Sequence, residues 1–89
     1  GKSEREVAPA LYDTLRNVAA QLATGARNFA ELEQSARDAL ARVGFEPDYV
    51  AIRGADDLGP PAADSGNLVV LAAAQLGGAR LIDNLLVEL

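Results

Sequence analysis

The apolar positions in the first half of the chain follow two helical stripes. The first stripe has spacings of three or four residues and consists of Val7, Leu11, Leu15, Val18 and Leu22. This spacing places all five side chains on one face of a helix. The pattern predicts a helix that ends near Ala23, because Gly25 can adopt the left-handed conformation that stops a helix.

The sequence allows two starting points for this helix. Residues Ser3-Glu4-Arg5-Glu6 have the form of a capping box, with serine at the cap and glutamate three positions later. Pro9 has no backbone N–H and disrupts a helix interior. Either the helix kinks near Arg5, or its regular part begins around Ala8 with Pro9 in the first turn.

A second helix follows after a short joint. Its apolar stripe is Phe29, Leu32, Ala36, Leu40 and Val43. Residues Asn28-Phe29-Ala30-Glu31 repeat the capping pattern, Gly44 suits the C-terminal cap, and Pro47 prevents continuation. Because the joint is short, the two helices are expected to form an antiparallel hairpin.

After Pro47 the pattern changes to that of strands. Residues 48–53 are rich in β-forming residues and predict a strand, and residues 54–66 predict a loop. The apolar run at residues 68–74 fits a strand buried on both faces, although its alanines leave a short helix open. Gly77-Gly78 predicts a hairpin turn before an antiparallel strand at residues 81–87.

The predicted order is helix, helix, strand, strand, strand. It indicates one α+β domain over residues 1–89, with an N-terminal helical hairpin packed on a small three-stranded antiparallel β-sheet. A chain of 89 residues is long enough for one small domain and too short for two.

Composition narrows the classes of function. The formal net charge of −5 argues against nucleic acid as a main partner. The chain has no cysteine and no histidine, which removes disulfides, thiolate metal sites and the commonest general base. No apolar run approaches the roughly 18 residues of a membrane span, and no signal peptide opens the chain. We therefore expect a cytoplasmic location without a membrane.

Three candidate sites are weak. Asp56-Asp57 could hold Mg²⁺, but a solvated acidic loop is favoured because a metal site usually needs further positioned oxygens. Gly77-Gly78 could approach a phosphate, yet no phosphate-binding motif surrounds it, so a plain turn is favoured. The serines, namely Ser3, Ser35 and Ser65, have no histidine to activate them as nucleophiles.

The strongest candidates are the polar residues Arg80, Asp83 and Asn84, which interrupt an apolar strand. Arg80 and Asp83 are three positions apart, so they point to opposite faces unless a bulge intervenes. Arg80 could bind a carboxylate or phosphate through two hydrogen bonds. The favoured interpretation is structural: Asp83 and Asn84 satisfy backbone groups, and Arg80 pairs with an acidic neighbour.

The residues taken alone predict a small α+β module that is not an enzyme. They include no nucleophile–base pair, no metal cluster and no phosphate-cradling loop. Neither catalytic residues nor cofactor-binding or metal-binding residues can be assigned. An autonomous protein-interaction module, marked by an exposed apolar patch, is the alternative that this composition leaves open.

Three segments resemble a known family, and they occur in the family's order over essentially the whole chain. They are residues 3–12, residues 44–50, and residues 71–84, which run from Leu-Ala-Ala-Ala to Arg-Leu-Ile-Asp-Asn. Together they resemble the C-terminal domain of the pantothenate synthetase (pantoate–β-alanine ligase) family. The most specific combination is Asp48-Tyr49-Val50 followed by Arg80-Leu81-Ile82-Asp83-Asn84.

The resemblance implies a parent enzyme that uses ATP and Mg²⁺ to join pantoate to β-alanine. The reaction passes through pantoyl adenylate and releases pyrophosphate and AMP. In this family a Rossmann-like N-terminal domain carries a His-x-x-His motif, and a Ser-Ser-Arg-Asn segment at the domain junction contacts the phosphates. The resemblance places both before Gly1.

None of those motifs occurs in this sequence, which has no histidine and no Ser-Ser-Arg-Asn segment. The family's principal catalytic residues therefore cannot be carried onto any position here. The resemblance implies instead a lid that closes over the active site and protects the acyl adenylate from water. It further implies a chain that is inactive alone, with the N-terminal catalytic domain as its partner, within a homodimeric parent.

Overall fold

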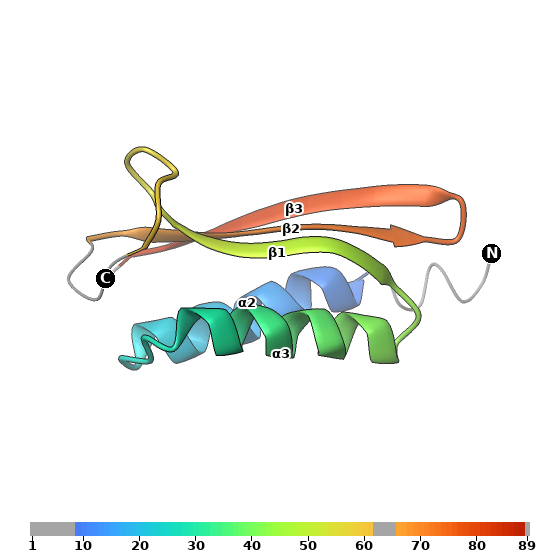
Figure 1. Ribbon diagram of the computed structural model, residues 1–89, viewed down its shortest axis with the longest axis horizontal. Coiled ribbons are helices and arrows are strands. Elements are labelled where there is room, and N and C mark those ends of the chain that lie inside the picture. The colour runs from blue at the N-terminus through green and yellow to red at the C-terminus, as the bar shows by residue number, and fades with distance from the viewer. Residues whose placement is uncertain (1–8, 62–65, 89) are drawn as a thin grey trace.

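The computed structural model describes residues 9–61 and 66–88, and it has two layers (Figure 1). Helices α2 (Pro9–Ala23) and α3 (Phe29–Arg42) form one layer. Strands β1 (Glu46–Gly54), β2 (Leu68–Leu76) and β3 (Ala79–Val87) form the other. The helices lie side by side against one face of the sheet. This arrangement confirms the predicted α+β fold and its element order.

Helix α2 begins at Pro9, so the described helix holds the proline in its first turn, where a missing N–H costs nothing. The proposed capping box and Val7 lie outside the described residues. The other stripe positions of this helix are buried as predicted, and they are Leu11, Leu15, Val18 and Leu22. These leucine and valine side chains form the part of the core nearest to β2 and β3.

Both helices end with the same left-handed glycine cap. Gly25 has a φ of 107° and Gly44 a φ of 104°. The closing N–H to C=O hydrogen bonds run from Gly25 to Leu22 (3.1 Å), Ala26 to Gln21 (3.0 Å), Gly44 to Ala41 (3.2 Å) and Phe45 to Leu40 (3.0 Å). This double pattern is the Schellman motif, and it satisfies carbonyls that a helix end leaves without partners. The predicted roles of both glycines are confirmed.

Two details of the α3 prediction are wrong. Asn28 occupies the N-cap position, but its amide donates to the Glu31 carboxylate (Nδ2 to Oε2, 3.1 Å) and makes no side-chain bond to the helix backbone. Val43 was expected in the buried stripe, yet it is 43% exposed because the helix ends at Arg42 and Val43 is its C-cap. The chain turns there, so the helical periodicity no longer decides which side chains are buried.

The sheet has the order β1-β2-β3, and both pairings are antiparallel. Strand β2 is therefore central and is buried on both faces along most of its length, which excludes the short-helix alternative. Strands β1 and β3 each begin two residues earlier than predicted. Leu76 pairs with Ala79, so Gly77-Gly78 forms the predicted two-residue turn, with a φ of 60° at Gly77.

The two faces of the sheet have different surroundings. The face toward the helices contributes Val50, Ile52, Leu68, Val70, Ala72, Ala74, Leu76 and Val87 to the core. Strand alternation places the intervening residues on the opposite side, which we call the open face. The open face consists of Tyr49, Ala51, Arg53, Val69, Leu71, Ala73, Gln75, Arg80, Ile82, Asn84 and Leu86. Neither described helix covers it (Figure 1).

Candidate functional site

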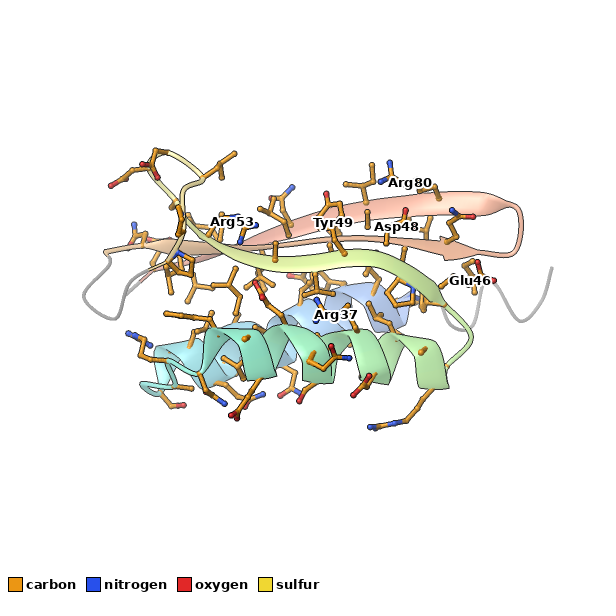
Figure 2. All side chains as sticks on the ribbon, in the orientation of Figure 1. Arg37, Glu46, Asp48, Tyr49, Arg53 and Arg80 are labelled. Carbon is orange, nitrogen blue, oxygen red and sulfur yellow. The ribbon has the colours of Figure 1, made fainter. Side chains whose placement is uncertain are left out.

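An ion pair crosses the open face from one edge strand to the other (Figure 2). The Nε of Arg80 on β3 donates to Oδ2 of Asp48 on β1 at 2.8 Å. The two strands are separated by β2, so their backbones lie about 10 Å apart. A long arginine side chain spans this distance. On β2, Arg80 is paired with Gln75, and the small Ala73 lies two residues along on the same face, paired with Tyr49.

A β-bulge brings Asp48 to this position. The pairing of β1 with β2 shifts between Pro47 and Tyr49, which makes Asp48 the extra residue on β1. Pro47 is tolerated there because β1 is an edge strand. Both Asp48 and Tyr49 therefore lie on the side of the sheet away from the helices, next to Arg80 (Figure 2). No hydrophobic pattern in the sequence indicates this bulge.

The three polar residues of β3 do not form one cluster. Arg80 and Asn84 lie on the open face, whereas strand alternation puts Asp83 on the side toward the helices, where it is half-buried. Oδ1 of Asp83 accepts a hydrogen bond from the backbone N–H of Asn84 at 2.8 Å. The Asp83 carboxylate therefore accepts a hydrogen bond within β3, whereas the Arg80 guanidinium pairs with Asp48 on β1.

We predict that the Arg80–Asp48 pair adds little stability. The two side chains are 52% and 34% exposed, and exposed ion pairs typically contribute about 0.2–1 kcal/mol. A double-mutant cycle of Arg80→Ala and Asp48→Ala, measured by urea unfolding, should give a coupling energy within that range. Arg42→Ala, at an exposed position on α3, is the matched control. A coupling energy above about 2 kcal/mol would show that the pair is a major structural element.

In the loop after β1, one carboxylate of the Asp56-Asp57 pair is used internally. Oδ1 of Asp57 accepts the N–H of Gly59 at 2.8 Å, and Gly54 exchanges backbone hydrogen bonds with Gly59 and Leu58 at 3.0 Å each. Within residues 9–61 and 66–88, no group of three or more metal-ligating side chains comes together. Asp56 and Asp57 therefore have no further described carboxylate beside them to complete a Mg²⁺ site.

A groove of about 270 Å³ lies between α2 and α3. Its polar lining includes Asp13, Asn17 and Ser35, and its floor is apolar. Ser35 has no histidine anywhere in the chain to activate it, while Ser3 and Ser65 lie outside the described residues. The groove offers hydrogen-bonding groups without a nucleophile–base pair.

Side chains that the sequence patterns did not single out cover the free edge of β1. Oε2 of Glu33 accepts the backbone N–H of Ile52 at 2.8 Å. Arg37 Nη1 lies 3.5 Å from the carbonyl oxygen of Val50, and Arg53 Nη1 donates to that of Ile52 at 3.0 Å. Glu33 and Arg37 are four positions apart, which places them on one face of α3. In the sequence, this spacing is the only signal that the two side chains act together.

The other arginines have varied surroundings. Arg27 donates to the carbonyl oxygens of Leu22 (2.9 Å) and Ala26 (2.7 Å). It thus helps to cap the end of α2. Arg16 lies over the ring of Tyr12, 5.9 Å from its centroid, and Arg5 lies outside the described residues.

The fold and the described side chains define a two-layer α+β domain in which no described residues form a catalytic constellation. A family model for pantoate–β-alanine ligase matches residues 1–86. The chain therefore belongs to the pantoate–β-alanine ligase family. No described helix is long and apolar enough to cross a membrane.

Individual relatives agree with this assignment. The chain is 52% identical over 86 residues to pantothenate synthetase of Ectopseudomonas mendocina, covering 97% of this chain and 30% of the relative. The corresponding protein of Nitrosococcus oceani is 51% identical over 88 residues, with coverages of 99% and 31%. A crystal structure of pantothenate synthetase from Thermus thermophilus superposes with a TM-score of 0.85 at 31% identity, covering 100% of this chain and 32% of that one.

These comparisons confirm the resemblance seen in the sequence. They also show that the chain spans about 30% of the length of the curated relatives that it matches.

Proposed function

We propose that this chain is the C-terminal lid domain of an ATP-dependent pantoate–β-alanine ligase. The observation that carries the proposal is that relatives called pantothenate synthetase match nearly the whole chain over 30% of their own length. The rest of their length is sufficient for the Rossmann-like domain that holds the catalytic residues. The complete absence of histidine from this chain fits such a division of labour.

The proposed reaction explains why a lid is useful. The pantoate carboxylate attacks the α-phosphorus of ATP, pyrophosphate leaves, and pantoyl adenylate forms. The β-alanine amine then attacks the acyl carbon, and AMP leaves as the amide forms. Because water would hydrolyse the acyl adenylate, the reaction benefits from a domain that covers the site and excludes solvent.

In this proposal the chain contributes shape and closure rather than chemistry. ATP and Mg²⁺ bind to the catalytic domain, to which the family resemblance assigns the nucleotide-contacting motifs. The parent enzyme is a cytoplasmic homodimer whose small-molecule substrates are pantoate, β-alanine and ATP.

A chimaera tests the proposal. This chain should replace the matching segment of the Ectopseudomonas mendocina enzyme, to which it is 52% identical. We expect the chimaera to release AMP from ATP in a pantoate-dependent and β-alanine-dependent reaction. The isolated chain should show no such activity, and its amide chemical shifts should change little with ATP and Mg²⁺. The E. mendocina enzyme without the segment is the control.

A correctly folded chimaera no more active than that truncated control would contradict the proposed function. Tight, saturable ATP binding by the isolated chain would contradict the proposal that ATP binds to the catalytic domain.

An autonomous interaction module is the second candidate, favoured by exposed apolar side chains such as Ile82 on the open face. Analytical ultracentrifugation distinguishes the two candidates when it is combined with the chimaera assay. A stable complex of the isolated chain together with an inactive chimaera supports the module, whereas an active chimaera supports the lid.

A further inference from the structure

The open face carries a group of exposed apolar side chains. Ile82 is 64% exposed, Leu86 52% and Tyr49 39%, and all three project on the side without helices. Tyr49 and Ile82 are both paired with Ala73 of β2, so their side chains flank the same small residue. A sheet face in contact with water normally carries polar residues at these positions. The apolar character therefore marks a contact surface.

The loop that follows β1 adds a second, independent observation. It rises on the same side of the sheet as the open face (Figure 1). Within it, Leu58 has a φ of 58° and is 57% exposed. A left-handed conformation is costly for leucine, about 1–3 kcal/mol, and such strain is concentrated at binding and switch regions. Hydrogen bonds from Leu58 to Gly54 and from Gly59 to Asp57 hold the strained turn in place.

The other surfaces of the domain are poorer candidates. The groove between the helices has an apolar floor, but polar side chains such as Asp13, Asn17 and Gln21 also line it. Among the described residues, the non-glycine residue with a positive φ, Leu58, lies in the loop after β1 and not at this groove. The free edge of β1 is already occupied by the side chains of Glu33 and Arg37. The open face thus combines exposed apolar area with a strained neighbouring loop.

We infer that the open face, together with Leu58, is the surface that packs against the remaining part of the ligase polypeptide. This inference rests on the proposed function. It specifies which face of this domain lies against the catalytic domain. The choice of occupant follows from the proposed function: the matched segment is 30% of the relative's length, and the proposal assigns the rest of that length to the catalytic domain. Inter-domain contacts of about 600–1,500 Å² are usual and combine apolar and polar groups.

Net charge disfavours a second copy of the chain as the occupant. Each copy carries a formal charge of −5, so two copies repel one another. The open face itself is less acidic than the whole chain, because it includes Arg53 and Arg80 and because Asp48 is paired with Arg80. Since Arg80 is 52% exposed, its guanidinium can also donate to a carboxylate of the catalytic domain.

Thiol labelling tests the inference, because the chain contains no native cysteine. Single variants Ile82→Cys and Leu58→Cys report on the proposed surface, and Val43→Cys at the end of α3 is the matched exposed control. Alkylation of each site is followed by mass spectrometry of its peptide, in the isolated chain and in the chimaera. We expect alkylation at positions 82 and 58 to slow by about tenfold or more in the chimaera, with position 43 unchanged, because burial limits thiol reactivity.

Equal alkylation rates at position 82 in the isolated chain and the chimaera would overturn the inference, as would slowing at position 43 alone. Slowing that depends on the concentration of the isolated chain would assign the face to a second copy and also overturn it. Ligase activity of the chimaera is scored separately, so an active chimaera with an accessible position 82 rejects the face and keeps the proposed function. If the chimaera does not fold, the same cysteines are placed at the aligned positions of the Ectopseudomonas mendocina enzyme.

Discussion

Replacing Leu40 by alanine is expected to lower the free energy of unfolding by about 2–5 kcal/mol. Leu40 is fully buried at the end of α3, in the core between the helices and the sheet. Alanine is a better helix former than leucine, so the loss comes from the cavity and the lost apolar contacts. A domain of this length is stable by only about 4–13 kcal/mol, which makes this single change a large part of the total.

Urea unfolding followed by circular dichroism measures this change. Val43→Ala, three residues along the chain at an exposed position, is the control and should change stability by less than about 0.5 kcal/mol. If Leu40→Ala lowered the free energy of unfolding by no more than this control, the assignment of Leu40 to the core would be wrong.

The core could be predicted from the sequence because burial follows periodicity. The four stripe positions of α2 in the described residues, and three of the five in α3, are buried as expected, and Phe29 is half-buried. The continuous apolar run of β2 indicated a strand buried on both faces, and the sheet order makes it central. Prediction failed at Val43, where a helix ended and the period no longer applied.

The polar contacts could not be predicted because they depend on placement between distant segments. The Arg80–Asp48 pair joins positions 32 residues apart in the sequence, and it depends on a bulge that inserts one residue into β1. A bulge shifts the register without changing the hydrophobic pattern, so composition and spacing do not reveal it. The alternation of β3 was predictable, and it correctly separated Arg80 from Asp83.

The two edges of the sheet show how placement decides the role of a charged residue. Asp83 and Glu33 are both carboxylates that accept a backbone N–H, yet Asp83 serves its own strand and Glu33 reaches β1 from a helix. The contact of Glu33 joins the two layers of the domain at the edge strand. Removal of the Glu33 side chain is therefore expected to affect both the packing of α3 against the sheet and the protection of the free edge of β1.

Glu33→Ala is expected to destabilise the domain by about 1–3 kcal/mol. The carboxylate accepts the Ile52 N–H at 2.8 Å, and its side chain is only 20% exposed, so alanine leaves a partly buried donor without a partner. Glu33→Gln keeps an acceptor without the charge and should cost less. The matched control is Glu31→Ala. The described contact of the Glu31 side chain is with the exposed amide of Asn28.

The same substitution should also increase self-association. An edge strand with unsatisfied backbone groups is a template for pairing with another strand, and Glu33 and Arg37 occupy those groups on β1. Sedimentation velocity at increasing concentration should show larger species for Glu33→Ala combined with Arg37→Ala, and fewer for either single variant. A double variant that unfolds at the same urea concentration as Glu31→Ala and stays monomeric would show that the helix side chains do not protect this edge.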